Sequence, residues 1–325
     1  MSESDGLICA YELNEDGSGT LTDAWDKLPS LQGEKPSWIH LDRGGNRTST
    51  WLHTESKLRP IIQEALMAEE SRPRCTSYNE GVFLNLRGLN LNPRAEPEDM
   101  LSVRIWIEPA RIITTCLHPL MAVQDVRDAL DQSNGPKDIG AFVIMLANRL
   151  TARIDPLLDE LQDRLDGLED TVVANVRREL RSDLARLRRR TILLRRYIGP
   201  QREALRALAT LDVEWLTDRQ RDRINEIADR VTRYVEDLDV IRDRASILQD
   251  ELTSLLTERM DRTMYVLSIV AVIFLPLTLV SGMLGMNVGG IPGEKNPWAF
   301  TVLSVAFVLI VALEVWLVRK LKWWV

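Results

Sequence analysis

Apolar and polar positions divide the chain into two unlike parts. Most of it mixes charged and apolar residues, but two apolar stretches, residues 264–283 and 298–318, lie near the C-terminal end, with Glu314 as their one charged residue. Each has the length of roughly 20 residues that a helix needs to cross the hydrocarbon core of a bilayer. Trp298 and Trp316 stand near the ends of the second stretch, as interfacial anchors do. We predict two transmembrane helices, because buried core helices this long and this apolar are rare.

A single long helix is predicted to lead into the first stretch. No Pro or Gly interrupts residues 213–275, and apolar residues recur there at gaps of three and four, the helical period. With Thr217 or Asp218 as the N-cap, the helix is expected to cover residues 218–284. At 1.5 Å per residue it would be roughly 100 Å long, with a kink at Pro276.

Residues 5–135 predict a mixed α/β domain, because short runs rich in β-branched and aromatic residues alternate there with helical patterns. The runs expected to form strands are Leu7–Leu13, Ser37–Asp42, Gly81–Leu89, Met100–Ile107 and Arg111–Cys116. The segments Pro60–Met67 and Pro119–Leu130 are expected to form helices between them.

A helical pattern also covers residues 140–198, and Gly199-Pro200 is expected to end it. Six arginines lie between Arg186 and Arg196. A nucleic-acid patch is one interpretation of that run. Its acidic neighbours and interleaved leucines favour the other, a solvated or ion-paired helix face.

Charge is distributed unevenly. The formal net charge of the chain is −7. Residues 263–325 have a net charge of +2, so residues 1–262 have a net charge of −9. An acidic soluble part argues against nucleic acid as a partner, because a phosphate binder needs a basic face. Basic residues flank the outer ends of both spans, whereas the loop between the spans holds one Glu and one Lys. The positive-inside rule therefore places both termini in the cytoplasm and the loop outside.

The chain has three cysteines and three histidines: Cys9, Cys75, Cys116, His40, His53 and His118. The cysteines are scattered and form no CxxC pair, which argues against a disulfide framework and for a reducing, cytoplasmic setting. Together the six residues are a candidate regulatory metal site. Their scattered spacing favours ordinary structural roles.

One face of the first span is a candidate pore lining. Residues at steps of three or four share that face, and they are Met264, Leu267, Ala271, Leu275, Thr278, Gly282 and Gly285. In a ring of copies, the apolar side chains would form a constriction and Thr278 would offer a hydroxyl group. The alternative is helix packing, for which small residues are common.

Steps of seven continue this face toward the start of the long helix, with a drift of ~20° per heptad. They reach Thr257, Asp250, Asp243, Glu236 and Asp229. In a ring of copies this acidic row would concentrate cations at the inner mouth. A solvated outer face is the alternative for all of them except Asp250, which is the acidic residue nearest the membrane.

Three segments at the C-terminal end resemble the CorA superfamily of divalent-cation transporters. They are Gly285-Met286-Asn287 after the first span, Phe274-Leu275-Pro276-Leu277-Thr278 within it, and the basic tail Lys320-Leu321-Lys322-Trp323-Trp324. Further segments resemble its ZntB zinc-transporter branch: Val288-Gly289-Gly290-Ile291-Pro292-Gly293, Trp51-Leu52, Ser71-Arg72-Pro73-Arg74, Arg195-Arg196-Tyr197 and Pro200-Gln201-Arg202. The resemblance covers essentially the whole chain.

The resemblance implies a homopentamer in the lipid bilayer of the inner membrane, with no enzymatic activity and no resident cofactor. Its long helices would form a cytoplasmic funnel, with Thr257, Asp250 and Asp243 toward the lumen. They would continue as the inner ring of membrane helices, and the second span would form the outer ring. Asn287, with Gly285 and Met286, would meet the arriving cation. The fold class expected is α+β, with a cytoplasmic α/β domain, a long-helix funnel and two C-terminal spans.

The corresponding domain boundaries can be stated by residue number. They are 1–137 for the α/β domain, 138–262 for the helical funnel, 263–285 for the first span, 286–297 for the external loop, 298–318 for the second span and 319–325 for the basic tail.

The residues of the spans limit the kind of metal site that can form there, but they do not identify the metal. Residues 263–325 contain no His or Cys, and their carboxylates are Glu294 and Glu314 only. No closed tetrahedral zinc site can form there, and oxygen groups such as the Asn287 amide suit a weakly bound, hydrated cation. Zinc, magnesium, cobalt and nickel all stay open on this basis. The branch resemblance favours zinc and implies coupling to protons.

Two functions of other classes are alternatives to transport. A membrane-tethered sensor, whose soluble domain signals, would conduct no ions and would tolerate loss of the Asn287 amide. An enzyme is disfavoured, because the sequence has no phosphate-binding glycine loop, nucleophile elbow or metal-hydrolase motif.

Overall fold

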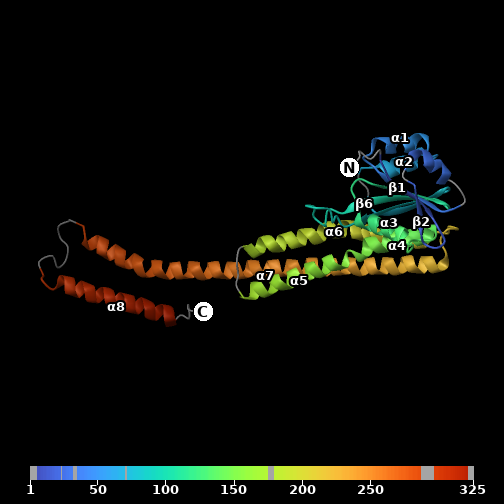
Figure 1. The fold of residues 1–325 in the computed structure, drawn as a ribbon. Coiled ribbons are helices and arrows are strands. Elements are labelled where there is room, and N and C mark those ends of the chain that lie inside the picture. Colours follow the sequence, from blue (N-terminus) through green and yellow to red (C-terminus); the bar gives the residue numbers. More distant parts are fainter. Residues whose placement is uncertain are drawn as a thin grey trace. The chain divides into compact units, whose positions relative to one another are not determined.

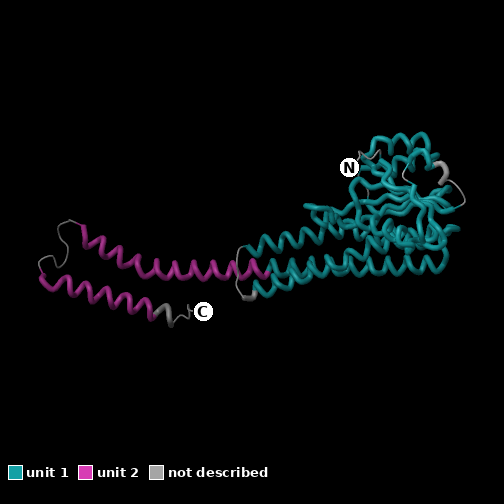
Figure 2. Tube along the Cα trace, in the orientation of Figure 1, with its two compact units in different colours: residues 1–250 teal, residues 251–325 magenta. Residues whose placement is uncertain are grey.

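The computed structural model describes residues 6–22, 24–31, 35–69, 72–174, 179–286 and 296–320. It contains two compact units, residues 1–250 and residues 251–325 (Figure 2). The first unit combines a sheet with helices and the second is helical, which confirms the predicted α+β class (Figure 1).

The first unit is built on a seven-stranded sheet with the order β2-β1-β3-β7-β6-β5-β4. The strands are β1 (Leu7–Leu13), β2 (Gly19–Thr22), β3 (Ser37–Asp42), β4 (Arg74–Tyr78), β5 (Gly81–Gly88), β6 (Leu101–Ile107) and β7 (Arg111–Cys116). Neighbouring strands are antiparallel except β3 and β7, which are parallel. The strands β2 and β4 therefore form the two edges.

Helices cover both faces of this sheet. The helices α1 and α2 lie on one face, and α3, α4 and part of α6 lie on the other (Figure 1). The helical elements are η1 (Trp25–Leu31), α1 (Asn46–Thr54), α2 (Pro60–Met67), α3 (Met121–Asp131), α4 (Ile139–Ala152), α5 (Asp155–Ala174), α6 (Glu179–Ala209), α7 (Asp218–Leu284) and α8 (Ala299–Lys320).

Strand β3 shows how the two layers share one sheet. Successive side chains of a strand point to opposite faces. Ile39 belongs to a buried cluster that includes Trp51 and Leu52 of α1. Its neighbour Trp38 packs instead against Phe142 of α4, with ring centroids 4.8 Å apart. Both faces of β3 are buried, so its apolar side chains and the polar side chains of Ser37 and His40 are all enclosed.

The predicted strands and the two helices predicted among them are all present, with ends within two residues of the expected positions. The sequence pattern misses β2, β4 and α1. Strand β2 has only four residues, and β4 reads Arg-Cys-Thr-Ser-Tyr, without an aliphatic run. Helix α1 begins with Asn, Arg and Thr and has no side-chain cap. Strands β2 and β4 are held by pairing with β1 and β5, and α1 by burial of Thr48, Trp51 and Leu52, rather than by local preference.

The expectation that Gly199-Pro200 ends a helix is wrong, because α6 continues through both residues. Proline inside a helix costs about 3 kcal/mol. Around it, Ile198 and Leu205 are fully buried and Gln201 is 1 % exposed, so burial of this helix face outweighs the local penalty. The helical pattern over residues 140–198 is divided among α4, α5 and α6.

Helix α7 confirms the predicted long helix, with both ends where the sequence places them and Pro276 inside. Within the first unit, one stripe of α7 is buried. Its apolar members recur at the helical period and include Ile224, Val231, Leu238, Ala245 and Leu248. The long helix therefore contributes its own share of the core of the first unit.

The arginine run on α6 contains ion pairs with carboxylates of other elements. Arg190 lies 3.1 Å from Glu98 and 3.2 Å from Glu160. Arg195 lies 2.6 Å from Asp239 of α7. These contacts agree with the interpretation of the run as an ion-paired helix face.

A histidine is buried inside the sheet without an acidic partner. His40 is 4 % exposed, and its Nδ1 lies 2.8 Å from the hydroxyl of Thr114, which also accepts a hydrogen bond from the indole of Trp38. Burial, reinforced by the positive charge of Arg127, lowers the pKa of His40 from 6.5 to about 3. The folded protein therefore holds a neutral imidazole at physiological pH.

Acid is expected to destabilise the first unit through this side chain. Between pH 6.5 and pH 3 the unfolded chain binds a proton at His40 and the folded chain does not, so stability falls as the pH falls. The loss between pH 7 and pH 5 should be about 2 kcal/mol. Chemical unfolding of the detergent-solubilised protein, followed by near-UV circular dichroism, measures it. His40→Gln should flatten the pH dependence, and equal slopes for both proteins would contradict the assignment.

Candidate functional site

The second unit places the predicted pore-lining stripe on an open face of α7. The side chains of Met264, Leu267 and Leu275 are 59 %, 61 % and 69 % exposed. Ala271, Thr278 and Gly282 on the same face are exposed as well. The structure therefore brings all six onto one surface, as helical spacing predicts.

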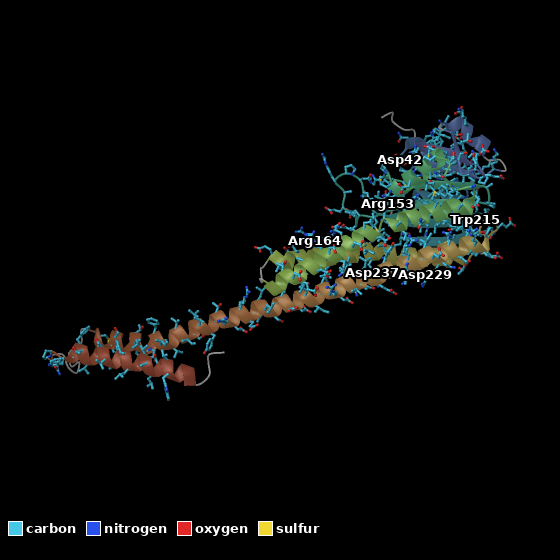
Figure 3. The ribbon with its side chains drawn as sticks, turned by 60° about the horizontal axis from the view of Figure 1, so that its bottom comes forward. Asp42, Arg153, Arg164, Trp215, Asp229 and Asp237 are labelled. Carbon is cyan, nitrogen blue, oxygen red and sulfur yellow. The ribbon has the colours of Figure 1, made fainter. Side chains whose placement is uncertain are left out.

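A different stripe of α7 is half-buried. It consists of Tyr265, Ile269, Ile273, Pro276, Leu277 and Val280. The neighbouring helix α8 has a half-buried stripe of matching period, with Leu303, Ala306, Phe307, Ile310 and Glu314. The two helices run side by side within this unit (Figures 1 and 3). They pack through these stripes and leave the candidate pore lining uncovered.

A groove of about 660 Å³ follows the open face. Its walls include Ala271, Leu275, Thr278 and Gly282, and it ends at Met286. The hydroxyl of Thr278 donates to the carbonyl of Phe274 at 2.7 Å, so its oxygen keeps a free lone pair. The groove is apolar apart from that oxygen.

The entrance motif begins where α7 ends. The amide of Gly285 donates to the carbonyl of Ser281 at 2.9 Å and completes the last turn. Met286 follows with 52 % exposure. Asn287, predicted to meet the cation, lies outside the described residues, as does the rest of the loop to residue 295.

The predicted acidic row lies on the solvent side of α7. Asp229, Glu236, Asp243 and Asp250 are all exposed, and Thr257 is exposed in the second unit. Asp229 lies 3.7 Å from Arg206, and Asp243 lies 2.9 Å from Arg242. Among the described residues no ion pair reaches Asp250 or Glu236.

The acidic row predicted from steps of seven does not include Asp237, a further carboxylate of α7 that Figure 3 labels together with Asp229. Burial and the adjacent Glu236 raise the pKa of Asp237, and Asp155 of α5 adds to the rise. Sequence spacing does not reveal the raised pKa of Asp237, because Asp155 lies far away in sequence and approaches Asp237 only through the packing of α5 against α7.

Glu314 lies on the half-buried face of α8, and its Oε2 atom is buried without a hydrogen-bond partner among the described residues. The hydroxyl of Tyr265, on the facing stripe of α7, is in the same condition. The side chains of Arg319 and Lys320, the basic residues that follow Glu314 on α8, lie outside the described residues.

The structure brings no metal-binding cluster together in the part of the chain that it describes. His40 is enclosed in the sheet, and Cys9 and Cys116 are buried. Burial raises the pKa of each of these two thiols to about 12, so neither is a thiolate at neutral pH. The candidate regulatory site built from histidines and cysteines therefore receives no support from these residues.

The long apolar helices of the chain agree with comparisons to known proteins. The helices α7 and α8 each contain a stretch long and apolar enough to cross a membrane, with mean hydropathy 2.4 and 2.3. Residues 33–320 match the family described as CorA-like Mg²⁺ transporter protein. The chain belongs to the CorA family. As a member it is a membrane transporter of divalent cations, in a family of transporters rather than enzymes.

Individual CorA-family relatives are similar over nearly the whole chain. "Divalent cation transporter CmaX" of Pseudomonas aeruginosa is 39 % identical over 325 residues, covering 98 % of this chain and 97 % of the relative. "Zinc transport protein ZntB" of Pectobacterium carotovorum is 35 % identical over 318 residues, covering 98 % and 96 %. The solved structure of full-length CmaX matches with a TM-score of 0.85 and 38 % identity, covering 98 % of this chain and 99 % of that one. The ZntB resemblance seen in the sequence is confirmed, whereas the likeness to CmaX was not anticipated.

Cysteine accessibility is expected to separate the two stripes of α7. In a Cys75→Ser background, Leu275→Cys should react with a membrane-impermeant, water-soluble thiol reagent, because its face is open. The matched variant Ile273→Cys should react at least tenfold more slowly, because that side chain packs toward α8. Labelling rates measured by mass spectrometry of the reconstituted protein test this expectation. Equal rates would mean that the open stripe is covered by lipid rather than water.

Proposed function

We propose that this chain transports zinc through a homopentameric pore in the inner membrane, with both termini in the cytoplasm. The observation that carries the proposal is the open stripe of α7, which is continuous, uncharged and ends at Gly285-Met286. One copy leaves a groove there rather than a tube. Symmetric copies that place this groove inward enclose a conduit, and lipid or α8 covers the remaining apolar surface.

Zinc is proposed because of the name of one set of relatives, ZntB. The residues of the stripe add a constraint to it. They supply no thiolate or imidazole ligand, so the ion passes with much of its water and binds weakly, as conduction requires. The Asn287 amide is proposed as the first polar group that the hydrated ion meets, and Asp250 attracts ions at the inner mouth.

Transport of magnesium, cobalt or nickel is the alternative within the family. It is favoured by the family description, which names Mg²⁺, and by the hydroxyl of Thr278 and the amide of Asn287, because oxygen ligands suit hard, hydrated cations. Only flux measurements separate it from zinc transport.

Removal of the Asn287 amide is expected to reduce flux strongly. Asn287→Ala in liposomes should lower the initial zinc flux by at least about tenfold, the effect of losing one hydrogen bond of roughly 1.4 kcal/mol from the entrance. A metal-sensitive dye inside the liposomes provides the measurement, and Asn134→Ala, an exposed position of the first unit, is the control. Full flux in Asn287→Ala would exclude the entrance role. Absence of flux for every metal in the wild-type protein would favour a membrane-tethered sensor.

Metal selectivity decides between zinc and the alternative. The same liposomes should show a higher initial rate with zinc than with magnesium, cobalt or nickel at equal concentration. Robust magnesium flux without zinc flux would reject the zinc proposal and leave the pore intact as a proposal.

Proton coupling is proposed through Glu314, the one carboxylate within the described spans. Its Oε2 atom is buried between α8 and α7 and has no partner there, which suits a group that carries a proton across part of the membrane. A gradient acidic on the outside should accelerate zinc uptake severalfold. Glu314→Gln should abolish the acceleration while flux without a gradient persists. Identical rates with and without the gradient would exclude coupling.

A further inference from the structure

A cluster of arginines in the first unit surrounds a pocket that the transport function leaves unused. The pocket has a volume of about 660 Å³ and lies between strand β4 and helix α6. Five arginines line it against one carboxylate, Glu203; the arginines are Arg72, Arg74, Arg195, Arg196 and Arg202. The soluble part of the chain is acidic overall, so this cluster is local and not part of a general basic surface.

Three separate segments build the pocket. Arg72-Pro73-Arg74 leads into β4, and Arg195-Arg196-Tyr197 and Pro200-Gln201-Arg202 lie one turn apart on α6. In the sequence these segments only support a family resemblance. In the fold all three meet at one cavity, which gives them a common role.

Aromatic rings hold two of the guanidinium groups at the pocket. Arg74 lies over the ring of Phe83 at 5.1 Å, and Arg196 lies over the ring of Tyr197 at 5.4 Å. Such stacking orients a guanidinium group and leaves its N–H donors free. Among the described residues neither arginine has a carboxylate partner, whereas Arg195 is bound by Asp239 and Arg202 by Glu203.

The floor of the pocket has an unusual composition for a helix. Gly199 and Pro200 stand together in the interior of α6, where both are among the least favourable residues. Packing does not require the glycine, because a Cβ atom at Gly199 would meet nothing within 4 Å. A side chain there would occupy the pocket instead. Pro200 also has no N–H to donate to the carbonyl of Arg196. This carbonyl therefore lacks its usual helical partner.

We propose that this pocket binds a small phosphorylated molecule of nucleotide size. Arginine forks bind phosphate oxygens in pairs, and several around one cavity suit more than one phosphate group. The volume lies within the range of about 300–1,000 Å³ typical of small-molecule sites. The apolar wall formed by Pro73, Ala204, Ala207 and Val235 fits a base or sugar ring, and the Arg196 carbonyl fits its amino or hydroxyl group.

Metal-free ATP is the probe for this site. Isothermal titration calorimetry of the full-length protein in detergent, with EDTA present, should give saturable binding of one ATP per chain. Adenosine should not bind at the same concentrations, and inorganic tripolyphosphate should bind at least threefold more weakly than ATP. The absence of saturable ATP binding would overturn the proposal. Equal binding of tripolyphosphate would overturn the nucleoside part of it.

Two matched pairs of variants locate the binding. Gly199→Phe fills the pocket while keeping every arginine, and it should weaken ATP binding at least tenfold. Gly167→Phe makes the same change on the exposed face of α5, where a Cβ atom also meets nothing within 4 Å, and it should leave binding unchanged. Equal weakening by both would exclude the pocket.

Charge reversal provides the second pair. Arg196→Glu should weaken ATP binding at least tenfold, and Arg189→Glu, an exposed position of α6 outside the pocket, should change it less than twofold. Equal effects would indicate diffuse electrostatic attraction and overturn the proposal. Near-UV circular dichroism of each variant establishes that it is folded. No ion gradient is involved, so these results are independent of the proposed transport.

Discussion

The second unit depends on one constraint: a helix that enters a bilayer must satisfy its backbone internally and cover its apolar side chains with something other than water. The membrane half of α7 meets the first condition at every residue except around Pro276, which has no N–H for the carbonyl of Val272. It meets the second only partly within one chain, since α8 covers one stripe. The open stripe belongs to the apolar surface that α8 leaves uncovered, which also includes Val272, Phe274 and Leu279. A single copy therefore needs lipid or further copies to cover it.

The first unit buries its apolar side chains within its own fold. A seven-stranded sheet is enclosed by helices on both faces, and α7 adds a buried stripe to the same core. The tight enclosure forces His40 to stay neutral and keeps the thiols of Cys9 and Cys116 protonated. These three side chains, which are candidate metal ligands in the sequence, are thus part of the buried core. Charged groups that can act on a solute lie elsewhere, on α7 and around the β4–α6 pocket.

Sequence periodicity was sufficient wherever the pattern was long or strongly apolar. Helix α7 and the open stripe followed from spacing alone, because one helical period runs through the whole segment. The pattern failed at β4 and α1, whose residues have weak intrinsic preferences, and at Pro200, where burial of Ile198 and Gln201 overrides a local penalty. It also missed Asp237 and the arginine pocket, since each joins segments far apart in sequence. Such sites depend on tertiary contacts that spacing does not encode.

The composition of the open stripe has a consequence for how a ring of copies would close. Leu267 and Leu275 offer no hydrogen bond to water, and Thr278 has already donated its proton to the backbone. A narrow column of water between such walls is only marginally stable and empties when the ring contracts slightly. Drying of the leucine levels would then stop an ion without any side chain swinging across its path. A small inward movement of α7 would therefore be enough to switch conduction off, and an equally small outward one would restore it.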